Sequence, residues 1–383
     1  MSRDPLTRAS ELTPKKSRTP KRPRARDLGI RIGVYPTGRH NAITDVPGVR
    51  VGHCTRIEGE GPLVPGEGPI RTGVTAIFPA RGNIFNQRVV GSGFVLNGAG
   101  EVAGLTQVTE WGLIETPIVL TNTLAVGTAS DAVVRWMVER NPGIGDQHDV
   151  VIPVVGECDD SWLNDATGRH IRAEQVWQAL DSAKGGAVEE GSVGGGTGMV
   201  TCDFNAGIGS SSRKLPVHEG GFTLGVLVMS NFGRRRRLTV AGRLIGPEFP
   251  DLMPELGSAP KPDGRHAEGS CIVIAATDAP LTSHQLARVA KRAAWGLIRT
   301  GSAGGNGSGE IALAFSTAYT LEASPRYTVE LLNTFATDDL FEATVDAAEE
   351  AVINSLCMAT TTVGRDGNTA YAIPLDRLAE LVG

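Results

Sequence analysis

Cysteine is scarce in this sequence of 383 residues, and its spacing suggests no pairing. The five cysteines are odd in number, lie far apart and form no C-x-x-C motif: Cys54, Cys158, Cys202, Cys271 and Cys357. We therefore expect no disulfide framework and predict a reducing, cytoplasmic compartment. The sequence also lacks any run of 18 apolar residues and any apolar N-terminal core. Neither a membrane span nor a secretion signal is expected.

Positive charge is concentrated at one end of the chain. Residues 1–31 hold ten Lys or Arg against three Asp or Glu. Because the formal net charge of the whole chain is −5, the remaining residues carry a net charge of −12. An acidic body argues against an enzyme that acts on nucleic acids, since phosphate binding favours a basic face.

The N-terminal segment differs from the body in composition. Residues 1–38 are rich in Pro, Ser, Thr and basic residues and contain few large apolar side chains. Such a segment buries too little surface to offset its loss of conformational entropy, so we predict a disordered basic extension. A tether to nucleic acid or to a membrane surface is the alternative. The body, residues 39–383, is expected to form one domain.

Strand and helix patterns alternate along the body. Glycine is abundant, with 49 residues, and aromatic residues are few, at 5%. Short apolar runs predict strands at residues 49–53, 73–79, 118–120, 150–155, 222–229, 270–277, 311–318 and 370–374. Apolar residues at helical spacing predict helices at 130–139, 169–184, 281–299 and 337–358. This mixture favours an α/β layered fold in which helices cover the sheets.

The junction between Gly269 and Ser270 is the first feature of the sequence that could take part in a chemical reaction. Residues 247–269 read as a long exposed loop, and a buried strand follows at once. A serine hydroxyl can attack the preceding glycine carbonyl in a strained turn, because glycine leaves the approach sterically open. Hydrolysis of the resulting ester would leave a serine at a new N-terminus, with an α-amine of pKa about 7.7–8.0 as a local base. A plain loop-to-strand junction is the ordinary alternative.

A glycine-rich segment at residues 304–310 suggests a second site. Its order is helix, glycines, strand, whereas a phosphate loop or dinucleotide fingerprint needs strand, glycines, helix, so a nucleotide site is not expected. Ser308 and Glu310 lie two residues apart and would share one face of a strand, where the carboxylate could orient the hydroxyl. A bulge with an exposed glutamate is the alternative. A further cluster at residues 194–198 indicates close backbone packing.

Two other features invite functional interpretations that the residues do not favour. The four arginines at 234–237 could bind phosphate, but a solvated turn between strands is the expected structure. His266 and Asp263 could complete a Ser-His-Asp triad with Ser270, but both lie in the loop before it. The remaining histidines show no metal-binding spacing, so no metal or other cofactor is expected.

Several motifs, in the same order, resemble the β-peptidyl aminopeptidase / L-aminopeptidase D-esterase/amidase family. They lie at residues 41–53, 97–101, 121–123, 155–157, 163–165, 231–233, 269–281 and 304–317, so that the resemblance covers roughly residues 38–380. The resemblance implies a four-layer αββα sandwich, two central sheets covered by helices. It also implies self-cleavage at Gly269–Ser270, which would give chains of residues 1–269 and 270–383.

The resemblance also implies roles for individual residues. Ser270 would be the nucleophile, and Ser308 and Glu310 would complete its activating network. Asn231 would donate to the oxyanion, and Glu157 would bind the ammonium group of the substrate. The processed units would form a homotetramer, and the substrates would be small peptides, amides or esters with a free N-terminus.

The sequence departs from this family after Glu157. Family members carry aromatic residues at this point, whereas Cys158, Asp159 and Asp160 follow here and Trp162 comes slightly later. A more acidic pocket is therefore expected. Two alternative functions are an acyltransferase of the ornithine acetyltransferase type, which would begin its second chain with threonine, and an uncleaved binding module with a basic tail for nucleic acid.

Overall fold

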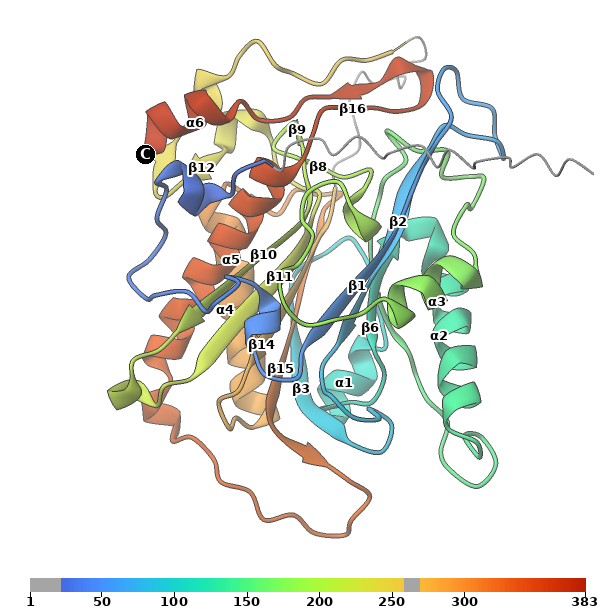
Figure 1. Cartoon of the computed structure of the whole chain (residues 1–383), viewed down its shortest axis with the longest axis vertical. Helices are drawn as coiled ribbons and strands as arrows, with labels where there is room; N and C mark the ends of the chain where they lie inside the picture. The colour runs from blue at the N-terminus through green and yellow to red at the C-terminus, as the bar shows by residue number, and fades with distance from the viewer. Residues whose placement is uncertain (1–21, 258–268) are drawn as a thin grey trace, which may run out of the picture.

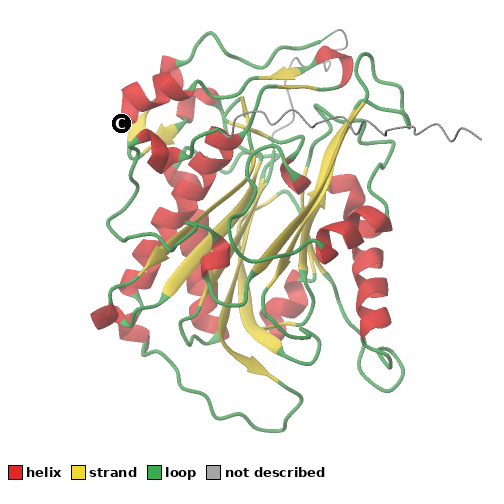
Figure 2. Cartoon of the chain, in the orientation of Figure 1, coloured by secondary structure: helices red, strands yellow, loops and turns green. Residues whose placement is uncertain are grey.

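Two central β-sheets are stacked between two layers of helices. The computed structural model describes residues 22–257 and 269–383. One sheet is covered by α2 (Val126–Arg140) and α3 (Ala173–Asp181), and the other by α4 (Ser283–Arg299) and α5 (Asp338–Met358) (Figure 1). Figure 2 shows the same four layers, with helices on both outer faces. The predicted αββα sandwich is confirmed.

The first sheet has five strands and the second has six. The first, in spatial order, consists of β1 (Arg50–Glu58), β2 (Ile70–Phe78), β6 (Ile118–Asn122), β7 (Val154–Cys158) and β4 (Val102–Ala103). The second consists of β10 (Gly207–Lys214), β11 (Thr223–Ser230), β14 (Cys271–Thr277), β15 (Gly309–Leu321), β3 (Arg88–Gly98) and β5 (Leu113–Ile114). The other described elements include α1 (Leu105–Trp111), α6 (Leu375–Val382) and the two-stranded pairs β8–β9 (Val200–Thr201, Phe204–Asn205), β12–β13 (Thr239–Val240, Arg243–Leu244) and β16–β17 (Thr362–Val363, Thr369–Ala370).

Strand β14 lies in the interior of the molecule. Ile272 and Ile274 belong to the core between the two sheets, whereas Val273 and Ala275 belong to the core under α4 and α5. Both faces of the strand are therefore covered, which explains why its sequence is apolar throughout instead of alternating with polar residues.

Strand pairing brings several chain ends to one edge of the sandwich. Strands β14 and β15 are parallel, and Cys271 pairs with Glu310 at their beginnings. Strand β3 is antiparallel to β15 and pairs Asn97 with Glu310 near its own end. In the facing sheet, β7 ends with Glu157 and Cys158. The loops that precede β14 and β15 thus lie at the edge of the sandwich at which β3 ends.

Strand β10 and the last expected strand differ from the sequence prediction. β10 was not expected, because residues 210–212 are three serines, yet all three are buried. Their hydroxyls bond to distant backbone groups, such as Ser210 Oγ to Val226 O at 2.7 Å and Ser211 Oγ to Ala347 O at 2.6 Å. The strand expected at 370–374 shrinks to β17, because Pro374 instead precedes the first turn of α6.

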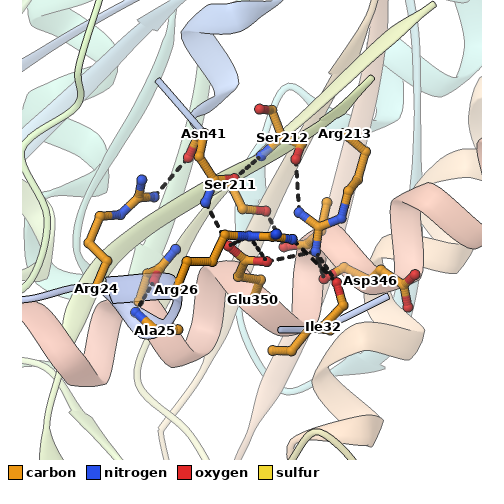
Figure 3. A network of polar contacts seen from close by, with 12 residues as sticks. Arg24, Ala25, Arg26, Ile32, Asn41, Ser211, Ser212, Arg213, Asp346 and Glu350 are labelled. Atoms are coloured by element: carbon orange, nitrogen blue, oxygen red, sulfur yellow. Dashed lines mark hydrogen bonds and ion pairs between the residues drawn. The ribbon is translucent and has the colours of Figure 1, made fainter. Parts of the chain in front are cut away.

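The prediction of a disordered extension at residues 1–38 is wrong for residues 22–38. Ala25–Leu28 forms a 3₁₀ turn whose first amide donates to Asn354 Oδ1 of α5 at 3.1 Å. Arg24 pairs with Glu190 at 2.8 Å. Arg26 pairs with Glu350 of α5 at 2.8 Å (Figure 3). These acidic partners lie more than 150 residues away, so the local composition could not indicate them. Residues 1–21 lie outside the described part of the chain.

Glu350 is the centre of this docking site. Its carboxylate also pairs with Arg213 of β10 at 2.8 Å and accepts a hydrogen bond from Asn41 Nδ2 at 2.6 Å (Figure 3). Burial alone would raise the pKa of Glu350, but the charges of Arg213 and Arg26 outweigh this effect and lower it. The N-terminal segment is thus held by an ionised carboxylate whose two oxygens both accept hydrogen bonds.

Candidate active site

Ser270 lies buried at the start of β14. The residue is 5% exposed, and its Oγ accepts a hydrogen bond from the backbone N–H of Gly309 at 3.2 Å. The Ser270 carbonyl accepts from Cys158 Sγ at 3.2 Å. Because β14 and β15 are parallel and in register, the turn that precedes β15 delivers the Gly309 amide to this hydroxyl.

The neighbouring Gly269 is pressed against Asn231. A Cβ added at Gly269 would lie 1.7 Å from the carbonyl oxygen of Asn231 and 2.5 Å from its Nδ2. Any larger residue would therefore require the backbone to move. The same contact places the side-chain amide of Asn231 beside Gly269.

The orientation of the Asn231 side chain is fixed at both ends. Its Nδ2 donates to the carbonyl of Asp159 at 2.9 Å, and its Oδ1 accepts from the amide of Val200 at 2.8 Å. These two bonds set which end of the amide group is the donor. A donor held in this way needs no reorganisation when charge develops nearby.

Ser308 and Glu310 form the polar group expected from their spacing. Ser308 Oγ donates to Glu310 Oε1 at 2.7 Å, and Ser302 Oγ donates to the same oxygen at 3.0 Å. Both Ser308 and Glu310 are buried, which contradicts the alternative of an exposed glutamate. Among the described residues, Glu310 Oε2 has no hydrogen-bond partner. Asn97 Nδ2 holds the turn by donating to the carbonyl of Gly305 at 2.7 Å.

Glu157 approaches Ser270 from the facing sheet. Its Oε1 accepts from the amide of Glu101 at 2.9 Å, and its Oε2 accepts from Thr123 Oγ1. A Cβ added at Gly100 would lie 3.1 Å from Glu157 Oε1 and 3.3 Å from Ser270 Oγ, so the two groups border the same small space. Burial raises the pKa of Glu157 despite these two hydrogen bonds.

Comparison with known proteins identifies the family of the chain. The model of peptidase family S58 matches residues 41–370. The chain belongs to this family.

Relatives in the same family are aminopeptidases. The β-peptidyl aminopeptidase BapA of Sphingosinicella xenopeptidilytica is 43% identical, over 94% of this chain and 91% of the relative. The solved β-aminopeptidase of a Burkholderia species is 41% identical with a TM-score of 0.84, over 94% of this chain and 99% of that chain. The L-aminopeptidase D-Ala-esterase/amidase of Ochrobactrum anthropi, described as a variant of the Ntn hydrolase fold, is 39% identical with a TM-score of 0.85, over 94% of this chain and all of that chain.

These findings establish the enzyme class. The chain is an aminopeptidase of family S58, a hydrolase with the Ntn type of fold. The alternative of a binding module is therefore set aside. In the part of the chain that the structure describes, no cluster of three or more His, Cys, Asp or Glu could hold a metal ion, and no helix is long and apolar enough to cross a membrane.

A cavity of about 390 Å³ opens beside Ser308 and Glu310. It is lined by Gly233, Arg234, Arg236, Arg237, Gly269, Gly301, Ser302, Ala303, Gly305, Asn306, Ser308 and Glu310. Cavities of this size that carry a few convergent polar groups are the usual sites for small ligands. The cavity thus joins the Ser308–Glu310 pair to the segment of four arginines.

The prediction of a solvated turn at residues 234–237 is wrong for Arg235. This side chain is buried, and its guanidinium lies 3.3 Å from the centre of the Phe204 ring. It donates to the carbonyls of Cys202, Asp203, Phe249 and Leu252. Arg235 therefore anchors the turn to the interior of the protein, whereas Arg236 and Arg237 are exposed.

The acidic residues that follow Glu157 point to other partners. The Asp159 carboxylate accepts from the Ser161 amide at 2.8 Å, and Asp160 Oδ1 accepts from Asn164 Nδ2 at 3.0 Å. Burial raises the pKa of Asp160 to about 7, so that this carboxyl adds less negative charge than an ordinary aspartate. His266 and Asp263 lie outside the described residues.

Some contributors to the site were not identified as such from the sequence. Thr123 bonds to Glu157, Ser302 bonds to Glu310, and Gly100 leaves the space between Glu157 and Ser270 open. Gly100 and Thr123 belong to motifs that carry the family resemblance, which is the signal that could have found them. Ser302 follows α4 closely and carried no signal of its own.

Proposed function

We propose that this S58 aminopeptidase cuts its own chain between Gly269 and Ser270 and then uses Ser270 as an N-terminal nucleophile. The observation that carries the proposal is the position of Ser270 Oγ, which is buried, bonded to the Gly309 amide and adjacent to a glycine pressed against Asn231. The hydroxyl and the candidate oxyanion donor therefore flank one peptide bond.

The self-cleavage would proceed through an ester. Ser270 Oγ attacks the carbonyl carbon of Gly269, and the C–N bond breaks as the hydroxyl proton passes to the nitrogen of Ser270. Water then hydrolyses the ester, which releases the Gly269 carboxylate and restores the Ser270 hydroxyl. Asn231 Nδ2 would stabilise the negative charge on the carbonyl oxygen in both steps.

The freed α-amine of Ser270 would be the base in substrate hydrolysis. Its reference pKa of about 7.7–8.0 suits proton transfer near neutral pH. It takes the proton of Ser270 Oγ as the hydroxyl attacks the substrate carbonyl, and it passes this proton to the leaving nitrogen. Water resolves the resulting ester with the same amine as base.

The other residues of the site would position the reactants. Glu157 would hold the ammonium group of the substrate by a charge-assisted hydrogen bond, because its carboxylate borders the space in front of Ser270. Glu310 orients Ser308 by accepting the proton of its hydroxyl at 2.7 Å, so that Ser308 Oγ can accept a hydrogen bond from the α-amine of Ser270.

The two chains produced by the cut would stay together. Strand β14 of the second chain pairs with β11 of the first chain, and β15 of the second chain pairs with β3 of the first. Both chains therefore share one continuous sheet. We also propose that the processed units assemble into a homotetramer, which the mass in solution would test.

Intact mass and N-terminal sequencing of the purified protein test the proposal directly. We expect two chains, the second of which begins at Ser270, and hydrolysis of aminoacyl p-nitroanilides. The Ser270→Ala variant should remain a single chain of 40.2 kDa without activity. Ser324→Ala, in an exposed loop, is a matched control that should still be cut. A Ser270→Ala protein that still divides into two chains would refute the mechanism.

A further inference from the structure

The cavity beside Ser308 and Glu310 carries an excess of positive charge. Arg236 and Arg237 line it, and among the described residues of its lining only Glu310 is acidic. Glu310 Oε1 already accepts hydrogen bonds from two serine hydroxyls. Of the described residues, the guanidinium groups of Arg236 and Arg237 therefore face one carboxylate in this cavity.

The chemistry of the site determines which part of a substrate would reach this cavity. In the proposed mechanism, the α-amine of Ser270 protonates the leaving nitrogen, and this amine arises at the bond to Gly269. Gly269 lines the cavity. The substrate's ammonium group, in contrast, lies at Glu157, which is not part of the cavity lining. The leaving group therefore departs on the arginine side of Ser270.

The arginines are presented from a rigid turn. Arg235, between them, is buried and donates to four backbone carbonyls, which fixes the backbone of residues 234–237. Arg237 Nε donates to the carbonyl of Gly301, which also lines the cavity, at 3.0 Å. Such preorganised guanidinium groups suit a planar carboxylate.

We propose that the cavity binds the free C-terminal carboxylate of a short peptide, so that the enzyme favours zwitterionic substrates over amides. Arg236 and Arg237 would contact the carboxylate, while Glu157 holds the ammonium group at the other end. This inference rests on the proposed function, because it uses the direction in which the leaving group departs.

The test compares two substrates that differ only in terminal charge. The acyl residue X is the one whose p-nitroanilide is hydrolysed fastest, and the probes are the dipeptide X-Ala and its C-terminal amide. We expect kcat/KM for the dipeptide to exceed that for the amide by roughly tenfold, as one charge-assisted contact would give. The ratio should fall as salt is added, because the arginines are exposed.

Variants of the arginines separate this contact from other causes. Arg236→Gln and Arg237→Gln should each lower the ratio of dipeptide to amide hydrolysis, and Arg236→Glu should reverse it. Arg243→Gln, which removes an exposed arginine of β13 outside the cavity, should keep the wild-type ratio.

The outcomes distinguish this inference from the proposed function. Equal hydrolysis of the dipeptide and the amide by the wild type would overturn the carboxylate site while leaving the aminopeptidase mechanism intact. An unchanged ratio in both the Arg236→Gln and the Arg237→Gln variants would also overturn it. Absence of Ser270-dependent hydrolysis of the p-nitroanilide would instead refute the proposed function.

Discussion

Glu350 and Glu310 are both buried carboxylates, but their surroundings differ. Both oxygens of Glu350 are bonded, to Arg26, Arg213 and Asn41, at 2.6–3.0 Å. Glu310 receives two serine hydroxyls on one oxygen, and its other oxygen has no partner among the described residues. The first carboxylate joins three distant segments, whereas the second leaves one oxygen without a described partner at the start of β15, where Glu310 pairs with Cys271 of β14.

The difference separates a structural from a functional use of a buried charge. A buried carboxylate is stabilised only when its charge is paired and its lone pairs are bonded, as at Glu350. An incompletely bonded carboxylate such as that of Glu310 reduces stability, and groups of this kind cluster at functional sites. Loss of Glu350 should therefore affect folding most, and loss of Glu310 should affect catalysis most.

Replacement of Glu350 gives the largest expected effect on stability. Glu350→Gln leaves Arg213 buried without its counter-charge, which should lower the free energy of unfolding by about 3–5 kcal/mol. Urea unfolding at pH 7 measures this loss. Glu330→Gln, on an exposed loop, should change the free energy by no more than about 0.5 kcal/mol.

The same substitution has a predicted pH dependence. The pKa of Glu350 is lowered in the folded protein, so its contribution is present above the unfolded pKa and is lost as the pH falls through the folded value. The difference in stability between the wild type and Glu350→Gln should therefore shrink in acid. If the difference in stability between the two proteins stays constant between pH 7 and pH 3, Glu350 does not stabilise the fold as an ionised carboxylate.

Replacement of Glu310 should have a smaller effect on folding and a marked effect on activity. Glu310→Gln weakens the orientation of Ser308, and kcat should fall about 100-fold, as for other proton-transfer networks, with little change in KM. The free energy of unfolding should change by about 1 kcal/mol or less, because the carboxylate is incompletely bonded. If the variant loses several kcal/mol of stability and keeps its kcat, the role of Glu310 is structural, like that of Glu350.

Asp160 offers a third buried carboxyl, with the smallest expected effect. Burial raises its pKa to about 7, so the folded protein holds a proton that the unfolded chain releases near pH 4. The contribution of the protonated Asp160 carboxyl to the stability of the fold is therefore lost as the pH rises from 4 to 7. Asp160→Asn should gain on the order of 1 kcal/mol relative to the wild type between pH 5 and pH 7.5 in urea unfolding. Asp131→Asn, an exposed residue of α2, should show no such trend.

The elements with strong local patterns could be predicted from the sequence. Strand β14 and helices α4 and α5 were located to within about two residues, because their apolar patterns are uninterrupted. Strand β10 was not predicted, because its buried serines depend on partners such as Ala347. The order of residues 22–38 was missed for the same reason, since the acidic partners of Arg24 and Arg26 lie far along the chain.

The candidate site shows the same division between local and distant information. The pairing of Ser308 with Glu310 follows from their spacing, and the structure bears it out with a 2.7 Å bond. The closeness of Ser270 to Gly309 depends on the register of two strands that are nearly 40 residues apart. The space around Gly100 depends on contacts between the two sheets. Only the family resemblance could anticipate these arrangements.

The position of β14 between β11 and β15 has a consequence for the life of the enzyme. In the proposed mechanism, the chain would be cut only after its central strand is in place, so that covalent continuity would serve assembly and would then be lost. After denaturation, recovery of the mature enzyme would require two separate polypeptides to meet, so its yield would depend on protein concentration, whereas the precursor could refold alone. The cut would thus make the folding of the single chain irreversible.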